Sequence, residues 1–296
     1  MAGVMQNPGA AVCCAGGRTY IGRMRAWING HLLDDAAQPA VRVTDHGLTV
    51  GDGVFEAVKV VDNQPFALTR HLRRLEKSVA GLGLPPLDLD VVRRGVAATL
   101  EGQDLPMGRV RITYTGGSAP LGSGRGDEPP TLIVVTAPTT GYDPTTSVVT
   151  VPWPRNERGA LAGVKSTSYA ENVVALAHAH AAGATEAIFA NTVGNLCEGT
   201  GSNIFYVIDG ELRTPTLASG CLAGVTRALI LEWYGAREVD EPVEILEEAS
   251  EVFLASTIRD IQGVARVDGR NYPAPGPITA DALKVWTAKE AENPDP

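Results

Sequence analysis

The amino-acid sequence predicts an α+β fold of two domains. Strand patterns dominate both halves of the chain and helical patterns are interspersed among them, which argues against a regular βαβ repeat. A run of turn-forming residues at 137–144 divides the 296 residues near the middle. We therefore expect a smaller N-terminal domain over 24–137, an interdomain linker over 138–145 and a larger C-terminal domain over 146–296.

Residues 1–23 are expected to be a disordered N-terminal extension. The segment Ala2–Gly17 consists mainly of small residues with weak patterning, and it lacks the basic start and sustained apolar stretch of a secretory signal. A strand pattern follows Met24 directly, so we expect the folded part of the chain to begin there.

The N-terminal domain is predicted to open with two hairpins. Ala26–Ile28 leads into Asn29–Gly30, a pair that tolerates positive φ and therefore suits a tight turn. The strand Val54–Val61 is rich in β-branched residues, and Asp62–Asn63 is expected to turn it toward a short partner at Phe66–Leu68.

Two helices and two further strands are expected to complete this domain. Apolar residues spaced by three or four predict the first helix: Leu72, Leu75, Val79 and Leu82. Gly83 marks its end, and a second helix is expected over Leu89–Leu100. Val110–Tyr114 and Thr131–Val135 are predicted to be strands on either side of a glycine-rich loop.

The C-terminal domain is predicted to alternate strands with two helices. The helices are expected over Tyr169–Ala182 and Val225–Tyr234, because a glycine follows each pattern at the C-cap. The predicted strands are Val148–Val151, Glu186–Ala190, Ile204–Val207, Val252–Ala255 and Val264–Val267.

The composition argues against several classes of protein. The net charge is −9 and no run of Lys and Arg interrupts it, which disfavours nucleic acid as a partner. No apolar stretch is long enough to span a bilayer. The four cysteines form no C-x-x-C pair, so we expect a reducing, cytoplasmic setting and no metal site. A small-molecule enzyme and a binding module both fit.

Two of the five lysines stand among apolar neighbours. Lys59 alternates with valines in a predicted strand and is expected to emerge from its outer face. Lys165 lies between an apolar run and three hydroxyl residues, with no acid between Glu157 and Glu171. A partly desolvated ammonium has a lowered pKa, which frees the amine as a nucleophile. The alternative is a lysine that reaches the surface along its aliphatic stem.

Two other segments carry polar groups that suit a ligand. Glu198 begins a tight, hydroxyl-rich loop before a strand. If the Glu198 carboxylate is buried, it can hold a cationic ring nitrogen; if the loop is an ordinary turn, the carboxylate lies in solvent. Gly224–Arg227 opens a helix whose free N–H groups suit a phosphate, although most helix starts bind nothing. Ser256–Thr257 follows a strand, and Arg74 offers a charged fork. Lys165 can bind an aldehyde, so these groups together could bind a single cofactor that carries an aldehyde, a ring nitrogen and a phosphate.

At these residues the sequence resembles the class IV, or fold type IV, pyridoxal-phosphate (PLP) enzymes. This family includes D-amino-acid aminotransferase, branched-chain aminotransferase and aminodeoxychorismate lyase. The likeness runs from about Met24 to near Val267. Six segments match in order: Thr49–Glu56, His71–Leu75, Gly163–Ser166, Glu198–Phe205, Leu222–Arg227 and Ser256–Thr257.

The resemblance implies a role for each matching residue. Lys165 forms a Schiff base with PLP and moves a proton between Cα and C4′, and Glu198 keeps the pyridine nitrogen protonated. The implied phosphate ligands are Arg74, Val225, Thr226, Ser256 and Thr257. Ser202 is expected beside the ring, Arg158 near the cofactor and Tyr169 near the ring hydroxyl. The family fold has two α/β domains with the cofactor between them, and a homodimer completes each site.

The family's substrate markers do not carry over to this chain. Phe55, Leu121 and Ser123 stand where D-amino-acid aminotransferases hold the substrate carboxylate with a Tyr, an Arg and a His. The candidates that remain for substrate binding are Phe55, Arg125 in the same loop, and Arg111 on the preceding strand.

Three activities are left open by the sequence. The leading prediction is a PLP-dependent transaminase that moves an amino group between an amino acid or amine and a 2-keto acid. The second is an aminodeoxychorismate lyase, which forms 4-aminobenzoate and pyruvate. The third is a non-catalytic PLP-binding protein.

Overall fold

The N-terminal part of the chain is built on an antiparallel six-stranded sheet. The computed structural model describes residues 10–15 and 18–296. The sheet has the order β4-β3-β8-β7-β5-β6. Its strands are β3 (Arg25–Ile28), β4 (His31–Leu32), β5 (Gly53–Val61), β6 (Gln64–Pro65), β7 (Met107–Thr115) and β8 (Thr131–Pro138). The two predicted hairpin turns are confirmed, since Asn29–Gly30 and Asp62–Asn63 all have positive φ.

One predicted strand of this sheet is wrong. The segment Phe66–Leu68 is not extended, because β6 ends at Pro65 and Leu68 already opens a helix. The N–H of Phe66 still donates to Lys59 O at 2.8 Å, but Ala67 turns the chain with a left-handed φ of 53°. The pairing with β5 therefore ends at Phe66, and the helix begins two residues later at Leu68.

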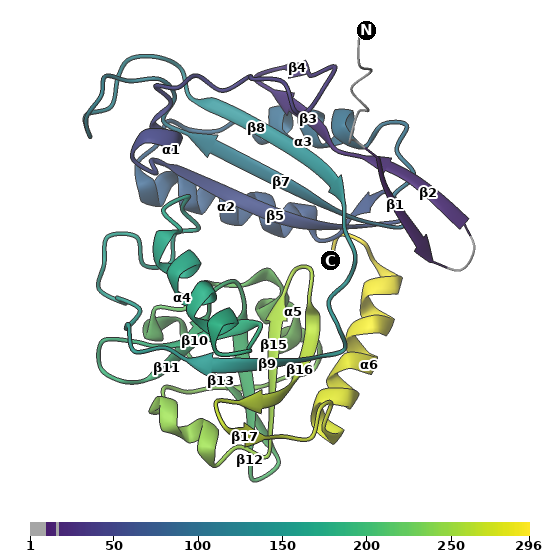
Figure 1. Ribbon diagram of the computed structural model, residues 1–296, viewed down its shortest axis with the longest axis vertical. Coiled ribbons are helices and arrows are strands. Elements are labelled where there is room, and N and C mark those ends of the chain that lie inside the picture. The colour runs from purple at the N-terminus through teal and green to yellow at the C-terminus, as the bar shows by residue number, and fades with distance from the viewer. Residues whose placement is uncertain (1–9, 16–17) are drawn as a thin grey trace, which may run out of the picture.

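Two helices cover one face of the sheet (Figure 1). Helix α2 (Leu68–Leu82) ends at Gly83, whose φ of 65° allows the left-handed cap, and α3 (Leu89–Leu100) starts at Asp88, whose carboxylate accepts from two backbone N–H groups. A short helix, α1 (His46–Thr49), precedes β5. Leu72, Leu75 and Val79 of α2 are buried against the valines of β5, so the period that predicted the helix also marks its core face.

The C-terminal part is a nine-stranded mixed sheet. Its main path is β11-β10-β9-β16-β15-β12-β13-β14, and β17 pairs with β16. The strands are β9 (Thr145–Thr150), β10 (Glu186–Ala190), β11 (Leu196–Gly199), β12 (Asn203–Ile208), β13 (Glu211–Thr214), β14 (Arg237–Glu238), β15 (Glu251–Ser256), β16 (Asp260–Val267) and β17 (Arg270–Asn271). Strand β9 lies parallel to both neighbours, β10 and β16.

Three helices pack around this second sheet. They are α4 (Ala170–Ala181), α5 (Val225–Trp233) and α6 (Pro277–Glu292); two 3-10 turns, Leu217–Ser219 and Val243–Glu247, complete it. Helix α6 was not predicted, because its few apolar residues are interspersed with charged ones and show no clear helical period. Ala282 and Trp286 of this helix are buried at the face of the second sheet.

Residues before Met24 include a hairpin. Where the sequence suggested an unstructured extension, β1 (Ala10–Ala15) and β2 (Arg18–Arg23) pair antiparallel, and they lie beside the six-stranded sheet (Figure 1). Residues 1–9 and 16–17 of that extension lie outside the described residues. Within the described part of the chain, no helix is both long and apolar enough to cross a membrane.

The two sheets are joined through a buried lysine. Lys59 was expected to emerge from the outer face of β5, but it is only 2% exposed. Its Nζ lies 2.5 Å from Asp260 Oδ1 at the start of β16 and also pairs with Glu290 on α6. Helix α2 covers the opposite face of β5, where Val58 and Val60 point. The Lys59 face is covered by β16 and α6 instead, so the side chain finds acidic partners in the other half of the molecule.

The C-terminal tail also returns to the N-terminal part. Ala67 N donates to Pro294 O at 2.7 Å, and Thr69 N donates to Asp295 Oδ1 at 2.8 Å. Asp295 therefore caps the start of α2, which has no side-chain cap of its own.

Candidate functional site

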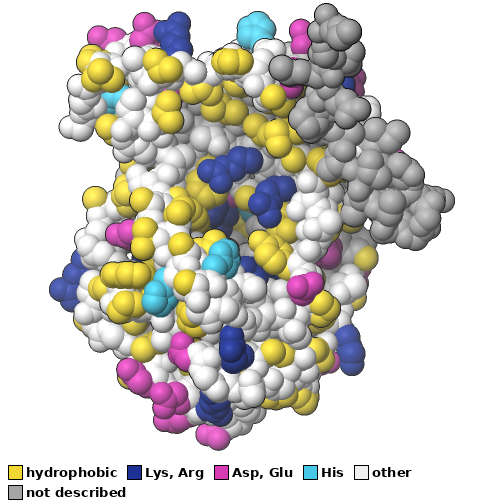
Figure 2. Space-filling model, in the orientation of Figure 1, with side chains coloured by type: hydrophobic (Ala, Val, Ile, Leu, Met, Phe, Trp, Pro, Cys, Tyr) yellow, Lys and Arg dark blue, Asp and Glu magenta, His cyan; other side chains and the backbone are white. Residues whose placement is uncertain are grey.

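A cavity of about 230 Å³ lies between the two sheets and is lined from both. Basic side chains gather in the hollow between the two lobes (Figure 2). Most of the residues singled out from the sequence line it: Phe55, Arg74, Arg111, Lys165, Tyr169, Glu198, Ser202, Val225, Thr226, Ser256 and Thr257. The tertiary structure thus brings together residues from segments that lie far apart in the chain.

Lys165 is held against the edge of β5. Its carbonyl accepts from Phe55 N at 2.9 Å, and its own N–H donates to Ser78 Oγ at 3.2 Å. The Nζ atom lies 4.5 Å from the centre of the Phe55 ring. Burial, with help from the positive charge of Arg74, lowers the pKa of Lys165 from 10.5 to about 8. The neutral fraction of the amine near neutral pH is therefore much larger than for a lysine with the ordinary pKa.

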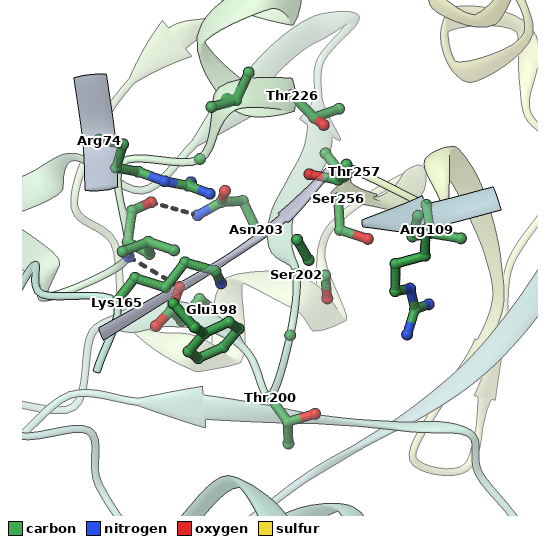
Figure 3. A pocket seen from close by; sticks show the side chains of 18 of the residues that line it. Arg74, Arg109, Lys165, Glu198, Thr200, Ser202, Asn203, Thr226, Ser256 and Thr257 are labelled. Carbon is green, nitrogen blue, oxygen red and sulfur yellow. Dashed lines mark hydrogen bonds between the residues drawn. The ribbon is translucent and has the colours of Figure 1, made fainter. Parts of the chain in front are cut away.

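Glu198, the penultimate residue of β11, lines the same cavity (Figure 3). Its Oε2 accepts from Leu222 N at 2.9 Å, and its Oε1 lies 3.6 Å from Arg155 Nε. Burial raises the pKa of Glu198, and Arg155 opposes that rise. The carboxylate is therefore poorly solvated and suited to a cationic group that enters the cavity.

The far end of the cavity offers several hydrogen-bond donors. Helix α5 begins after Gly224, which has no side-chain cap, so the first N–H groups of the helix have no partner within it. A Cβ on Gly224 would collide with Asn203 Oδ1, which shows how closely the loop approaches β12. Thr226 stands in the first turn of α5, and Ser256 and Thr257 extend from the end of β15 (Figure 3).

Arg74 is fixed at this end by a buried carboxylate. Its Nε and Nη2 donate to the two oxygens of Glu56 at 2.8 and 2.7 Å, while Nη1 donates to Ala223 O at 3.0 Å. His71 Nδ1 lies 2.7 Å from the same carboxylate. Burial alone would raise the pKa of Glu56, but Arg74 and His71 lower it to about 2. Glu56 was part of a matching segment, yet sequence reasoning gave it no role.

Two aromatic side chains, Phe55 and Tyr169, form part of the cavity wall. The rings of Phe55 and Tyr169 meet edge to face, with centroids 5.2 Å apart. The guanidinium of Arg111 lies 3.5 Å from the centre of the Phe55 ring. Burial raises the pKa of Tyr169 and lowers that of Arg111. The Phe55 ring thus contacts two basic side chains, Arg111 and Lys165.

Two residues singled out from the sequence lie outside this cavity. Arg158 points into solvent, with its side chain 79% exposed, and contacts Glu157. Arg125 forms two hydrogen bonds to the Asp52 carboxylate and also donates to the carbonyls of Leu82 and Gly83. Arg125 is held by residues that lie 42 to 73 positions away in the chain, and sequence spacing does not reveal such partners.

Other lining residues were missed by the sequence analysis. Arg155 contacts Glu198, Asn203 donates to Leu222 O at 2.9 Å, and Arg109 and Tyr142 line the mouth. Arg155 is three residues before the expected Arg158, and only the turn between them decides which one faces inward. Arg109 alternates with Arg111 on β7, and that two-residue period was the available signal. Among the described residues, no three His, Cys, Asp or Glu side chains are grouped to hold a metal.

Comparison with known proteins adds to this geometry. The sequence pattern of the family described as "Amino-transferase class IV" matches residues 53–267, more than half of the chain. A putative branched-chain-amino-acid aminotransferase of Methanocaldococcus jannaschii is 34% identical over 269 residues, which cover 86% of this chain and 93% of that protein. A D-alanine aminotransferase of Staphylococcus epidermidis is 27% identical, with 83% and 90% covered.

Solved structures agree with these relatives. The fold IV-transaminase CpuTA1 from Curtobacterium pusillum is 33% identical with a TM-score of 0.77, over 89% of this chain and 93% of that one. A putative 4-amino-4-deoxychorismate lyase from Legionella pneumophila is 25% identical with a TM-score of 0.80, over 87% and 98%. The resemblance and the α+β fold predicted from the sequence are both confirmed. This chain belongs to the class IV aminotransferases, a family of PLP-dependent enzymes with fold type IV.

Proposed function

We propose that this enzyme is a transaminase that holds PLP through Lys165 and exchanges an amino group between an amino acid or amine and a 2-keto acid. The observation that carries the proposal is the pairing of two buried groups in one cavity. The amine of Lys165 has a lowered pKa, and the carboxylate of Glu198 has a raised one. The lowered pKa suits the Lys165 amine to bind the aldehyde of PLP, and the buried Glu198 carboxylate suits the protonated ring nitrogen of PLP.

The donor set of the cavity fits PLP. The start of α5, with Thr226, Ser256 and Thr257, offers N–H and O–H groups at one end, and the guanidinium of Arg74 stands beside them. Such a set suits a phosphate. Glu198 stands where a protonated ring nitrogen would relieve the cost of its burial. When bound, PLP supplies an electron sink that makes the α-hydrogen of an amino acid acidic.

Each side chain of the cavity would then have its own role in the reaction. Lys165 binds the cofactor aldehyde and, once released from it, carries the proton to and from the substrate Cα. Glu198 holds the proton on the ring nitrogen, and Arg155 keeps that carboxylate charged. Phe55 and Tyr169 shield the amine from water, since their rings pack against each other beside it. Ser202 lines the cavity beside Glu198.

The test is a half-reaction followed by the visible absorption of the cofactor. Wild-type protein should bind PLP with a visible absorption band, and an amino donor should bleach the band in the absence of any keto acid. Lys165→Ala should abolish the reaction. Lys77→Ala removes an exposed lysine of α2 and should leave it intact. Full turnover by Lys165→Ala would overturn the proposal.

A lyase is the second candidate, because a putative 4-amino-4-deoxychorismate lyase shares the fold and a quarter of the sequence. The two activities use the same cofactor contacts, so the cavity lining favours neither. Aminodeoxychorismate supplied without a keto acid separates them. Steady release of pyruvate over many turnovers would show the lyase, whereas a transaminase would stop after one. A protein that binds PLP but converts no substrate would be a binding protein.

The proposed assembly is a homodimer. A second cavity of about 670 Å³ also borders Lys165, Tyr169 and Glu198, and its wall includes the exposed side chains of Leu48 and Val50. Exposed apolar groups beside a site indicate a surface that a partner covers. Light scattering should give twice the chain mass of 31.1 kDa. A fully active monomer would contradict this assembly.

A further inference from the structure

The segment 163–168, which carries Lys165, belongs to the C-terminal half of the chain but packs on the N-terminal sheet. Strand β6 covers only the last residues of β5, so the first residues of β5 are left open along the same edge. Ser166 forms an antiparallel bridge with Val54 on this open edge. Beside the bridge, Phe55 N donates to Lys165 O at 2.9 Å. The segment thus extends the N-terminal sheet by a short strand-like pairing.

The hydroxyl residues that follow Lys165 in the sequence strengthen this pairing. Thr167 N donates to Gly53 O at 2.7 Å, and the Thr167 hydroxyl donates to the carbonyl of Gly51 at 3.0 Å. The Ser168 hydroxyl donates to the same Gly51 carbonyl at 3.1 Å. The chain is therefore fastened to β5, and to the residues just before it, on the C-terminal side of Lys165.

A side chain, and not the strand, holds the N–H of Lys165. In a continued antiparallel ladder this N–H would donate to Phe55 O, because directly paired residues of this kind exchange both hydrogen bonds. It donates instead to the hydroxyl of Ser78, on α2, at 3.2 Å. Ser78 is only 2% exposed and lies outside the two cavities described above. The pairing with β5 therefore ends at Lys165, where a buried hydroxyl fixes the backbone.

Helix α2 holds a second group of the cavity on the same face. Arg74 and Ser78 are four residues apart, so their side chains leave neighbouring positions of the helix surface. Arg74 is fixed by two hydrogen bonds to Glu56 and a third to Ala223 O. One helix face therefore sets the position of the guanidinium proposed for the phosphate and of the lysine proposed for the aldehyde.

We propose that Ser78 is a positioning residue, which directs the Lys165 amine toward the reacting carbon by holding the Lys165 backbone N–H. This inference rests on the proposed function, in which the amine carries a proton to and from the substrate Cα. Such a transfer requires the two atoms within hydrogen-bond reach, and a displacement of about 1 Å can lower a rate roughly a hundredfold. Because Ser78 lies outside the cavities, its loss should change the direction of the amine and leave ligand binding nearly intact.

Half-reaction kinetics of the PLP-loaded protein test the positioning role. In Ser78→Ala the limiting rate with an amino donor should fall about tenfold or more, while the half-saturating donor concentration and the PLP affinity stay within about threefold of wild type. Ser78→Thr keeps the hydroxyl and should recover most of the rate. Thr99→Val is the matched control, because it removes a buried hydroxyl of α3 outside both cavities. Equal limiting rates in Ser78→Ala and this control would overturn the inference.

Hydrogen exchange tests the contact itself without cofactor or turnover. In the cofactor-free protein the Lys165 amide should exchange about tenfold faster in Ser78→Ala than in wild type, the effect of losing one hydrogen bond, and at the wild-type rate in Thr99→Val. An unchanged exchange rate in Ser78→Ala would contradict the inference. If Ser78→Ala reacts like wild type while Lys165→Ala is inactive, only the role of Ser78 is lost. If Lys165→Ala turns over fully, the proposed function is lost and the role of Ser78 with it.

Discussion

Lys59 on β5 and Asp260 at the start of β16 form an ion pair of 2.5 Å that joins the two sheets of the molecule. Glu290 of α6 completes the group, and Phe66 and Trp286 cover the ammonium with their rings at 5.4 and 5.9 Å. The cavity lies between the same two sheets. The ion pair therefore helps to set the spacing of the halves that supply its walls.

Removing this lysine should destabilise the fold. Lys59→Met leaves two partly buried carboxylates together without a cation, and the loss of one partner of a buried pair costs about 3 kcal/mol or more. Urea unfolding followed by circular dichroism should show that decrease. Lys284→Met, at an exposed position of α6, should unfold at the wild-type midpoint. A Lys59 variant as stable as wild type would show that the pair has no net effect.

The same group predicts a dependence of stability on pH. Burial and the repulsion of Glu290 raise the pKa of Asp260 from 3.8 to about 6, although Lys59 opposes the rise. A raised pKa in the folded state means that folding favours the protonated acid. The contribution of Asp260 is therefore greatest below pH 3.8 and is lost as the pH rises through about 6.

Asp260→Asn tests this dependence. The variant should lose less stability than wild type between pH 4 and pH 6.5, because the amide does not ionise. The free energy of unfolding at several pH values gives the comparison, with the exposed Asp34→Asn as control. Parallel pH profiles for wild type and Asp260→Asn would refute the prediction.

Capture of the cofactor should follow the titration of Lys165. Since only the neutral amine attacks an aldehyde, the rate at which the cofactor-free protein binds PLP should increase as the pH rises through about 8. Stopped-flow absorption measures this rate. A midpoint near the ordinary value of 10.5 would show that the amine is not desolvated in solution.

Arg155 should matter for the charge of Glu198. Arg155→Leu removes the cation that opposes the rise in the pKa of Glu198, so that pKa should increase further. We expect PLP affinity to fall about tenfold, because a neutral acid no longer pairs with a cationic ring nitrogen. Equilibrium dialysis of PLP measures the effect. Arg158→Leu, whose side chain points into solvent, should retain wild-type affinity.

Gly224 should tolerate no side chain. A Cβ at this position collides with Asn203, so Gly224→Ala should displace the start of α5 and cost about 1–3 kcal/mol of stability. PLP binding should weaken with it, since the same N–H groups face the cavity. Gly269→Ala is the control, because a Cβ there has no heavy atom within 4 Å. Unchanged melting and unchanged PLP affinity in Gly224→Ala would contradict this account.

The helices with a wide apolar stripe were predictable from the sequence, and so were the tight turns. Helix α3 has the limits that its periodicity predicted, and Asn29–Gly30 turns with positive φ. Helix α6 was not foreseen, because Ala282 and Trp286 become an apolar face only when the second sheet is there to cover them. A narrow stripe among charged residues carries no signal of its own.

What the sequence by itself determined is the set of chemical groups: a lysine among apolar neighbours, an acid before a strand, and a helix start with hydroxyls. Which arginines face those groups was decided by the tertiary structure. Arg155 faces inward while Arg158 points into solvent, and Arg109 faces the mouth while Arg125 is held by Asp52. The physical reason is that residue type follows from the chain alone, whereas the direction of a long charged side chain depends on the partners that folding places around it.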